Sequence, residues 1–439
     1  MAEIAHTKRL LECWQGDEVF RARLHEDPAL AAGELGLATR PLWDAQVDWS
    51  LPVSQEVQRY RAFVAEKFAH RDELRRTSQP KSSNFHGWRV RQMFRTHSQL
   101  GGAKAHGIVH PLAAFELSKG CSVGCWFCGV SAPKLGDILA YTDANRDLWR
   151  QVCTVWREEI GPAAEQAFLY WATDPLDNPD YEHFACDFHE LCGYFPQTTT
   201  AIPLRDAERT RRVLRISEER GCLLNRFSIL TSKTLQRVHQ TFTAEELAFV
   251  ELVLQMPKET TSKAVAGRAR DRALARGETD LEASTIACIS GFLVQMIDRT
   301  IQLISPCPAN EHWPMGYIVF AQRSFHDGES FRQALRELMS DQVMPPVASG
   351  LPRVALRGDL EGQVSEVGLV LSNSHLRQTF RGLSHAGLEK LGQLLAGDGL
   401  PAGELAVQLE HDDLATVFLV LNQLLAKGVL EEERWLRSD

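Results

Sequence analysis

Residues 115–129 read Phe115-Glu-Leu-Ser-Lys-Gly-Cys121-Ser-Val-Gly-Cys125-Trp-Phe-Cys128-Gly129. Three thiolates within eight residues can hold a metal, but they cannot all pair with one another as disulfides. Iron–sulfur clusters are held by cysteines at short, fixed spacings, and a loop of three leaves one iron of a four-iron, four-sulfur cluster open to a small molecule. The spacing therefore predicts a 4Fe-4S cluster on Cys121, Cys125 and Cys128.

Zinc is the alternative metal for a cysteine-rich loop. Structural zinc sites usually combine two short units, either CxxC pairs or Cys/His pairs. No second unit with that spacing occurs in this sequence. Glycines at 120, 124 and 129 also let the backbone wrap closely around a bulky inorganic core. The loop therefore indicates iron and sulfur rather than zinc.

Strand and helix patterns alternate from about residue 108 to residue 343. An apolar strand at 113–117 ends directly at the cysteine loop, and further strands are expected at 167–171, 197–202, 226–231 and 300–304. Helical spacing separates several of them, at 143–160, 180–192 and 205–220. Strands separated by helices of this length pair in parallel through crossover connections. The pattern predicts an α/β fold with a βα barrel, in which chemistry takes place at the carboxyl ends of the strands.

The CxxxCxxC spacing, with Phe127 immediately before the last cysteine, resembles the radical S-adenosylmethionine (radical SAM) superfamily. The resemblance implies a partial (β/α)6 radical SAM barrel, with S-adenosyl-L-methionine (SAM) bound to the open iron. It also implies contacts of Phe127 with the adenine, of Thr173 and Asp174 with the SAM amino group, and of Ser228 with the ribose. The glycines usual before such an acid are absent here. Asp174 could instead start a simple strand-end turn with Pro175, and Ser228 could be a buried hydroxyl bonded to backbone.

Two other regions flank the barrel. Residues 1–107 show helical apolar spacing, including a charged amphipathic helix at 56–76, and are expected to form a helical N-terminal region. Residues 350–439 combine short strands with three helices. This succession resembles the winged-helix-like modules by which many peptide-modifying radical SAM enzymes bind a leader peptide at a strand edge. A DNA-binding winged helix is the alternative, but the many Glu and Asp residues after Ser384 disfavour it.

Composition and charge restrict the function further. The chain has 439 residues, 44% of them hydrophobic, which is enough for two or three domains with real cores. Ten cysteines without an apolar amino-terminal segment favour a reducing, cytoplasmic location. No apolar run approaches the length of a membrane span. A net charge of −9 makes nucleic acid an unlikely partner, because phosphate attraction dominates such binding.

Two cysteines outside the loop are candidates for chemistry. Cys307 follows the apolar strand 300–304 and is flanked by Pro306 and Pro308, which hold the backbone extended. A thiol at the carboxyl end of a late barrel strand is expected to face the same cavity as the cluster. Cys288 is the second candidate. The other five cysteines are expected to be small core residues.

The sequence around these sites resembles a narrower group, the radical SAM peptide epimerases that mature proteusin-type ribosomal peptides. The resemblance rests on residues 115–129 together with Ala287-Cys-Ile-Ser-Gly-Phe292, Ser305-Pro-Cys307 and Trp313-Pro-Met-Gly-Tyr317. It implies an isomerase that converts L-residues of a precursor peptide into D-residues. A SAM-derived radical would take an α-hydrogen, and Cys307 would return one as the catalytic residue. The implied partners are a precursor peptide with its leader and an electron donor such as flavodoxin or ferredoxin.

Two other functions share some of these features. A radical SAM maturase that forms thioether or carbon–carbon crosslinks would use the same cluster, but such enzymes often carry further cysteine-rich cluster domains near the carboxyl end. No cysteine follows Cys307 here. A non-catalytic iron–sulfur regulator is the second alternative. The basic, alanine-rich segment 263–276 is expected to be a solvated helix face rather than a surface that recruits substrate.

Overall fold

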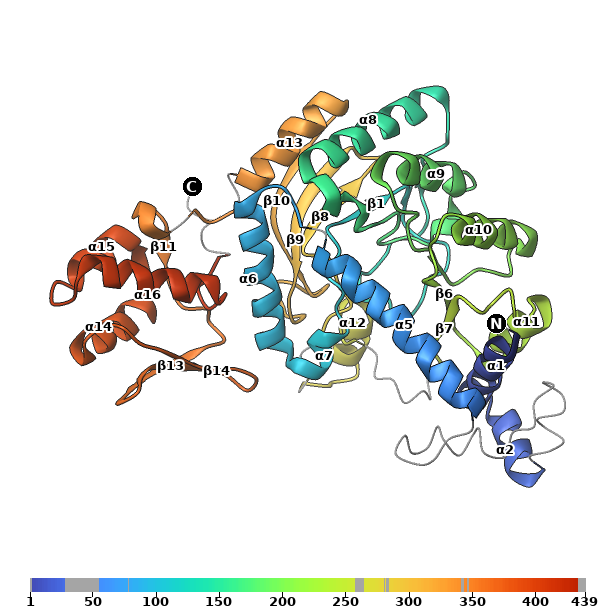
Figure 1. Cartoon of the computed structure of the whole chain (residues 1–439), viewed down its shortest axis with the longest axis horizontal. Coiled ribbons are helices and arrows are strands. Elements are labelled where there is room, and N and C mark those ends of the chain that lie inside the picture. Colours follow the sequence, from blue (N-terminus) through green and yellow to red (C-terminus); the bar gives the residue numbers. More distant parts are fainter. Residues whose placement is uncertain are drawn as a thin grey trace.

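The structure is a computed structural model of the full chain (Figure 1). It describes residues 2–27, 55–77, 79–256, 264–279, 281, 284–340, 343–345 and 347–432. Part of the predicted helix at 263–276 lies outside these ranges.

The central sheet has five strands in the order β10-β9-β8-β1-β4. β1 (Ala113–Glu116) pairs in parallel with β4 (Ala167–Phe168) on one side and with β8 (Gly291–Gln295) on the other. β9 (Thr300–Pro306) and β10 (Tyr317–Ser324) extend the sheet in antiparallel fashion. Parallel pairing is therefore confirmed for β1, β4 and β8, whereas the predicted strand at 300–304 pairs in antiparallel fashion.

A second sheet contains three parallel strands in the order β5-β6-β7. They are β5 (Thr199–Thr200), β6 (Asn225–Ile229) and β7 (Val250–Leu254). The six parallel strands therefore form two hydrogen-bonded sheets, and the last of them, β8, pairs with β1. The single six-unit barrel stays a prediction, whereas the mixed α/β class with parallel strands is confirmed.

One face of the central sheet, here called the helix face, packs against helices. α8 (Asp143–Ile160), α9 (Tyr181–Cys192), α13 (Gly328–Ser340) and α6 (Ser83–Leu100) contribute buried side chains to the same core as Phe115, Phe292 and Leu303. α8 shows why such a helix forms. Thr142 caps its first turn through a hydrogen bond to Asn145 N, and Leu148, Trp149, Val152 and Trp156 recur on one buried face.

The opposite face of the central sheet, here called the lumen face, carries a separate apolar cluster. Ala114 of β1, Leu293 of β8, Ile304 of β9 and Tyr317 of β10 belong to it, and Phe168 of β4 packs against it. Side chains alternate along each strand, so these residues point away from the helices. The second sheet has its own core on its outer side, built with helices α10 (Ala207–Glu219) and α11 (Ser232–Thr241).

The described residues of the amino-terminal region are mostly helical. Its helices are α1 (Ala2–Gly16), α2 (Glu18–Glu26), α5 (Gln55–Thr77), α6 and α7 (Gly102–His106). α1 packs against α5 and α11. α5 runs beside β6 and β7, whereas α6 belongs to the core of the central sheet (Figure 1).

The carboxyl-terminal residues form a module with its own core. Strands β12 (Glu361–Ser365), β13 (Gly368–Ser372) and β14 (Arg377–Phe380) make an antiparallel sheet, and β11 (Arg353–Val354) pairs with β15 (Leu400–Pro401). Helices α14 (His385–Leu395), α15 (Ala402–Gln408) and α16 (Leu414–Ala426) cover the sheet. The module thus combines short strands with three helices, while the winged-helix assignment stays a prediction.

Polar side chains join this module to α6, which lies between the module and the central sheet in Figure 1. Both guanidinium nitrogens Nε and Nη2 of Arg91 donate to the Glu432 carboxylate, at 3.0 and 2.9 Å, and both side chains are buried. Gln92 donates to the same carboxylate at 3.0 Å. Arg357 donates to Ser98 Oγ at 2.9 Å. Buried charges with this many partners fix the orientation of the module.

Short elements complete the described part of the chain. β2 (Ser118–Lys119) pairs with β3 (Asp137–Ile138), and α12 (Gly267–Ala275) is a further short helix. Short 3-10 helices occupy Gly161–Glu165, Pro175–Asp177 and Val347–Ser349. No helix among the described residues is long and apolar enough to cross a membrane.

Candidate active site

The cysteine loop leaves the central sheet at the carboxyl end of β1, where the sequence predicts it. It is enclosed by the β2–β3 pair, and Cys121 N donates to Pro133 O at 2.9 Å. Gly120 adopts φ +86°, and a Cβ there would lie 2.3 Å from the carbonyl oxygen of Lys134. Only glycine fits this close approach, so the tight entry into the loop depends on it.

The three thiols of the loop are half-buried, and none of them forms a disulfide. Burial raises the pKa of Cys125 to about 11, and the neighbouring thiols of Cys121 and Cys128 add to the shift. Burial also raises the pKa of Cys121, against hydrogen bonds from the backbone of Val123 and Asp174.

The donor set suits an iron–sulfur cluster. Backbone N–H groups point at two of the sulfurs, Val123 N at 3.5 Å from Cys121 Sγ and Ala132 N at 3.3 Å from Cys128 Sγ. Such hydrogen bonds tune clusters held by thiolates. Within the described part of the chain, no group of three or more His, Cys, Asp or Glu side chains converges as a site for one metal ion. A four-iron cluster gives each cysteine its own iron, so its ligands need not converge on a point.

Helix α12 holds the cysteine loop from outside. Arg268 Nη1 donates to Cys125 O at 3.0 Å, Nη2 donates to Ala132 O, and the backbone N donates to Cys128 O at 3.0 Å. Gly267, at φ +51°, allows the approach, because a Cβ there would lie 2.5 Å from Gly129 O. The prediction that this basic helix presents only a solvated face is therefore wrong for Arg268, because the loop supplies carbonyl oxygens that need donors.

A second contact joins the loop to the turn after β4. Ser122 donates to the Asp177 carboxylate through its backbone N at 2.8 Å and its hydroxyl at 2.6 Å. Arg205 Nη1 donates to the same carboxylate at 2.7 Å. The turn that contains Thr173 and Asp174 is therefore adjacent to the cysteine loop, as a SAM site would require.

The Asp174 carboxylate already has partners within the chain. It accepts hydrogen bonds from Leu176 N at 3.0 Å, Ala201 N at 2.7 Å and Thr200 Oγ1 at 2.8 Å, and its side chain is buried. Burial raises the pKa of Asp174 to about 6, against these hydrogen bonds. The carboxylate thus stabilises the strand-end turn, which was the alternative interpretation of Asp174-Pro175. Its role as a SAM ligand stays a prediction.

The other predicted SAM contacts are partly exposed. Thr173 donates to the Asp174 carbonyl at 3.4 Å, and Phe127 packs edge-on against Trp126 with ring centroids 5.4 Å apart. Ser228 lies between Phe227 and Ile229, which are buried in the outer core of the second sheet. Because side chains alternate along a strand, Ser228 faces the inner side of that sheet. Its position is compatible with a ribose contact, which remains a prediction.

Cys307 and Cys288 lie on different faces of the central sheet. Cys307 is 3% exposed and belongs to the helix-face core, together with Leu303. Cys288 is half-buried and packs against the lumen-face cluster of Ala114 and Ile304. The strand alternation that directs Leu303 toward the helices also directs Cys307 there. The expectation that Cys307 faces the cavity therefore differs from the structure, because β9 runs antiparallel to β8 and Cys307 packs into the helix-face core. Cys288 lies on the lumen face.

Glu116 is a buried acid that the sequence analysis did not single out. It is the last residue of β1, and its carboxylate accepts a hydrogen bond from Ala172 N at 2.7 Å and one from Gln295 Nε2 at 3.3 Å. Burial raises the pKa of Glu116 to about 7, partly opposed by these bonds. The signal was present in the sequence, because a lone acid in the apolar strand before a cysteine loop is unusual.

Comparison with known proteins identifies one relative. The uncharacterized protein y4wI of Sinorhizobium fredii is 37% identical over 474 aligned residues, which cover 99% of this chain and 90% of that protein. This chain belongs to the y4wI family. No family model matches the chain. The name y4wI carries no activity, so the function of the family has to be argued from the site.

Among solved structures, the chain is similar to BtrN, determined in complex with AdoMet and 2-DOIA. The TM-score is 0.33 at 12% identity, and the match covers 53% of this chain and 82% of BtrN. A likeness this slight carries no argument about the y4wI family.

Proposed function

We propose that this chain is a radical SAM enzyme that converts L-residues into D-residues in a ribosomally made precursor peptide. The supporting observation is the position of Cys121, Cys125 and Cys128 at the carboxyl end of a parallel strand, beside the Thr173–Asp174 turn. Active sites of βα barrels occupy this end. The enzyme would draw electrons from a donor such as flavodoxin or ferredoxin.

The three cysteines would hold a 4Fe-4S cluster, with SAM at the open iron. When bound, this pair supplies a SAM-derived radical that can take an α-hydrogen from a peptide residue. The chain itself would supply the opposing hydrogen. We propose Cys288 for this role in place of Cys307, because a donor must contact the substrate radical and Cys288 lies on the lumen face. Its S–H bond breaks as the new Cα–H bond forms, and the thiyl left behind needs one electron and one proton.

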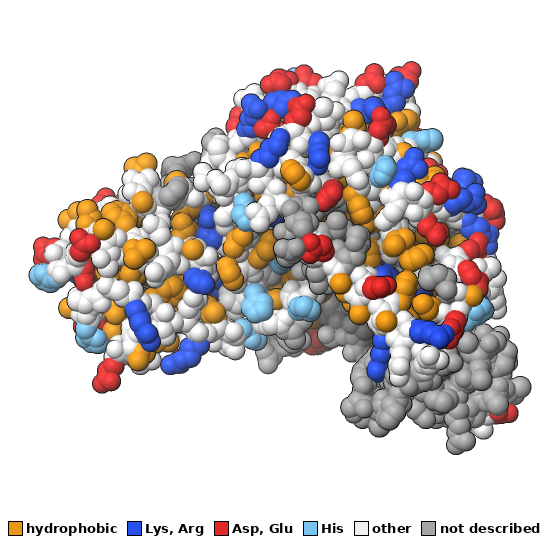
Figure 2. All heavy atoms as spheres, viewed as in Figure 1, with side chains coloured by type: hydrophobic (Ala, Val, Ile, Leu, Met, Phe, Trp, Pro, Cys, Tyr) orange, Lys and Arg blue, Asp and Glu red, His pale blue; other side chains and the backbone are white. Residues whose placement is uncertain are grey.

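The carboxyl-terminal module would bind the leader of the precursor. Both outer strands of its sheet, β12 and β14, have a hydrogen-bonded neighbour on one side only among the described strands. Five of the ten large apolar side chains exposed in the described chain belong to this module: Leu351, Val367, Val407, Leu414 and Leu419. Figure 2 shows orange apolar atoms spread over this end of the molecule. An open strand edge suits an extended peptide.

The decisive experiment combines cluster reconstitution with peptide analysis. The protein is loaded with iron and sulfide under anaerobic conditions, and then incubated with SAM, a reductant and the precursor encoded beside its gene. We expect 5′-deoxyadenosine and D-residues. In heavy water each inverted α-carbon should carry one deuterium, because a thiol proton exchanges with solvent. A Cys121→Ala, Cys125→Ala, Cys128→Ala variant is the control and should yield neither product.

Other outcomes of the same experiment identify the alternatives. Crosslinks without D-residues would indicate a peptide-crosslinking maturase, since such an enzyme needs the same cluster and leader site. Bound iron without SAM cleavage would indicate a non-catalytic iron–sulfur regulator.

Leader binding is measured separately by titrating the full chain with a labelled leader. Leu414→Asp and Leu419→Asp should weaken it, whereas Val19→Asp, an exposed valine on α2, should not.

A further inference from the structure

A cavity of about 300 Å³ lies at the end of the strands opposite the cysteine loop. Its lining comes from the amino ends of the parallel strands: Pro111 before β1, Ala167 at the start of β4, Gln197 before β5, Arg226 near the start of β6 and Glu251 near the start of β7. The cysteine loop follows the carboxyl end of β1. The cavity is therefore separate from the candidate active site, and its volume is within the range of small-molecule sites.

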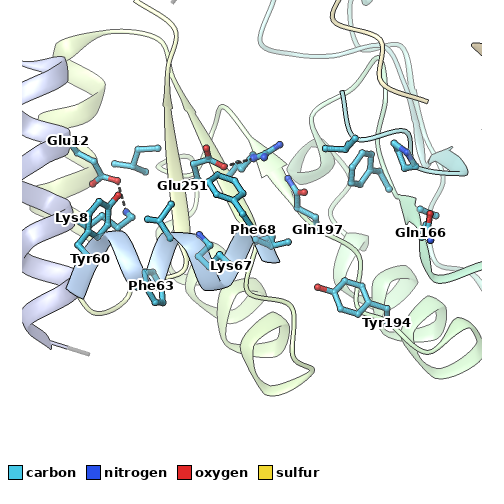
Figure 3. Close-up of a pocket in the computed structure, with 18 of the residues that line it drawn as sticks. Lys8, Glu12, Tyr60, Phe63, Lys67, Phe68, Gln166, Tyr194, Gln197 and Glu251 are labelled. Carbon is cyan, nitrogen blue, oxygen red and sulfur yellow. Dashed lines mark hydrogen bonds and ion pairs between the residues drawn. The ribbon is translucent and has the colours of Figure 1, made fainter. Parts of the chain in front are cut away.

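Helices α1 and α5 close the cavity on its outer side (Figure 3). α5 contributes Tyr60, Phe63 and Phe68, β4 contributes Phe168, and the segment after α9 contributes Tyr194. Five aromatic rings around one small volume provide a surface that stacks on flat or apolar groups. Such walls favour a ligand with an aromatic or aliphatic body.

Four charged side chains in the cavity wall pair with one another. Lys8 Nζ lies 2.5 Å from Glu12 Oε1, and Arg226 Nε lies 2.7 Å from Glu251 Oε2. Glu12 also contacts His239 Nε2 at 3.2 Å. The dashed lines in Figure 3 mark the Lys8–Glu12 pair and the pair that Glu251 forms. These charges are neutralised internally, so they give the cavity a polar rim without a strong preference for a ligand charge.

Lys67 differs from these four. In the described part of the chain its ammonium makes no hydrogen bond or ion pair to a carboxylate, and its nearest named partner is the ring of Phe63, 5.8 Å from the nitrogen. Burial lowers the pKa of Lys67, against the attraction of Glu251. A cation held in an aromatic cavity without an anion within bonding distance costs free energy, which an anionic ligand would offset.

We propose that this cavity binds an organic anion whose carboxylate contacts Lys67 and whose aromatic or aliphatic body packs against Tyr60, Phe68 and Phe168. The site needs neither the cluster nor SAM, so it stands apart from the proposed epimerase activity. Because α1 and α5 both line it, a bound anion would join the amino-terminal helices to the strands.

Calorimetric titration of the full chain, without iron or SAM, tests the proposal with two probes. The first is 4-phenylbutyrate and the second is its uncharged amide, which has the same body. We expect the acid to bind at least about tenfold more tightly than the amide, because only the acid can pair with Lys67. This comparison needs no variant, so it does not depend on the folding of a mutant protein.

Variants then assign the contact. Lys67→Met should lower acid affinity by about tenfold or more and leave the amide unchanged, and Lys67→Arg should keep the preference for the acid. Lys427→Met is the matched control, because Lys427 also lies over a phenylalanine ring, that of Phe94 at 5.4 Å, but outside the cavity. Equal binding of acid and amide, no binding of the acid at millimolar concentration, or an acid preference that survives Lys67→Met would each overturn the proposal.

Discussion

Arg268 donates a hydrogen bond of 3.0 Å from its guanidinium to the backbone carbonyl of Cys125, the middle cysteine of the loop. The same residue also reaches the carbonyls of Cys128 and Ala132. A loop that turns its thiols inward leaves carbonyl oxygens directed outward, and these need donors when they are buried. One arginine therefore ties three backbone carbonyls of the loop to helix α12.

Replacing Arg268 should impair cluster assembly. Arg268→Ala removes two side-chain donors and leaves the carbonyls of Cys125 and Ala132 without them. We expect affinity for the cluster to fall by roughly tenfold or more, as for other residues that orient ligands. Iron content and the visible absorbance of the reconstituted protein measure this. Arg276→Ala is the matched control, since Arg276 ends the same helix and, among the described residues, pairs with the exposed Glu278. Equal iron content in both variants would contradict the role of Arg268 in holding the cysteine loop.

Local features of this fold could be predicted from the sequence. The helix predicted at 143–160 occurs at Asp143–Ile160, because its apolar spacing and its threonine cap are local signals. The cysteine loop lies at the end of a parallel strand for a similar reason. The strand before it is apolar and short, and the ligand spacing is contained within eight residues.

Contacts between distant segments could not be predicted in the same way. The bond from Arg268 to Cys125 joins residues 143 positions apart, and no periodicity in the sequence records it. The pairing of β8 with β1 depends on which strand edges meet, which hydropathy does not specify. The side on which Cys307 is buried depends on strand parity at a position between two prolines, and a shift of one residue would reverse it.

Replacing each of the two candidate donor cysteines should have a different effect on epimerisation. Cys288→Ser should still form 5′-deoxyadenosine with peptide and SAM, while D-residues fall by at least about tenfold, because an O–H bond donates a hydrogen atom poorly. Cys307→Ser, which changes a thiol on the helix face, should keep epimerisation if it folds normally. Loss of D-residues only in the well-folded Cys307→Ser variant would return the donor role to Cys307.

Glu116 should make stability depend on pH. Its folded-state pKa is raised to about 7 from 4.5, so between these values the folded chain binds more protons than the unfolded chain. Its contribution to the free energy of unfolding is thus lost as pH rises toward 7, by up to about 3 kcal/mol. Glu116→Gln should be more stable than the native chain at about pH 8 and similar at about pH 4.5. Glu361→Gln, at an exposed strand position, is the control in urea unfolding. A Glu116→Gln variant that lost stability equally at both pH values would contradict this.

The ion pair between Arg91 and Glu432 should control the docking of the carboxyl-terminal module. Arg91→Ala leaves the buried Glu432 carboxylate with Gln92 as its remaining named donor, and we expect a loss of about 3–5 kcal/mol in the free energy of unfolding. Arg146→Ala is the matched control. It removes an arginine from exposed pairs with Asp143 and Asp147, which should cost less than about 1 kcal/mol.

A double variant distinguishes lost docking from a general defect. In Arg91→Met with Glu432→Leu the unpaired charge is gone, so much of the stability should return, because apolar side chains of similar volume can replace a buried pair. Leader affinity of the full chain should follow the same order, provided that the module binds the leader in its docked position. Urea unfolding and a leader titration measure both effects on four proteins: the native chain, Arg91→Ala, Arg146→Ala and the double variant. If Arg91→Ala unfolds at the same urea concentration as the native chain, the pair does not hold the module in place.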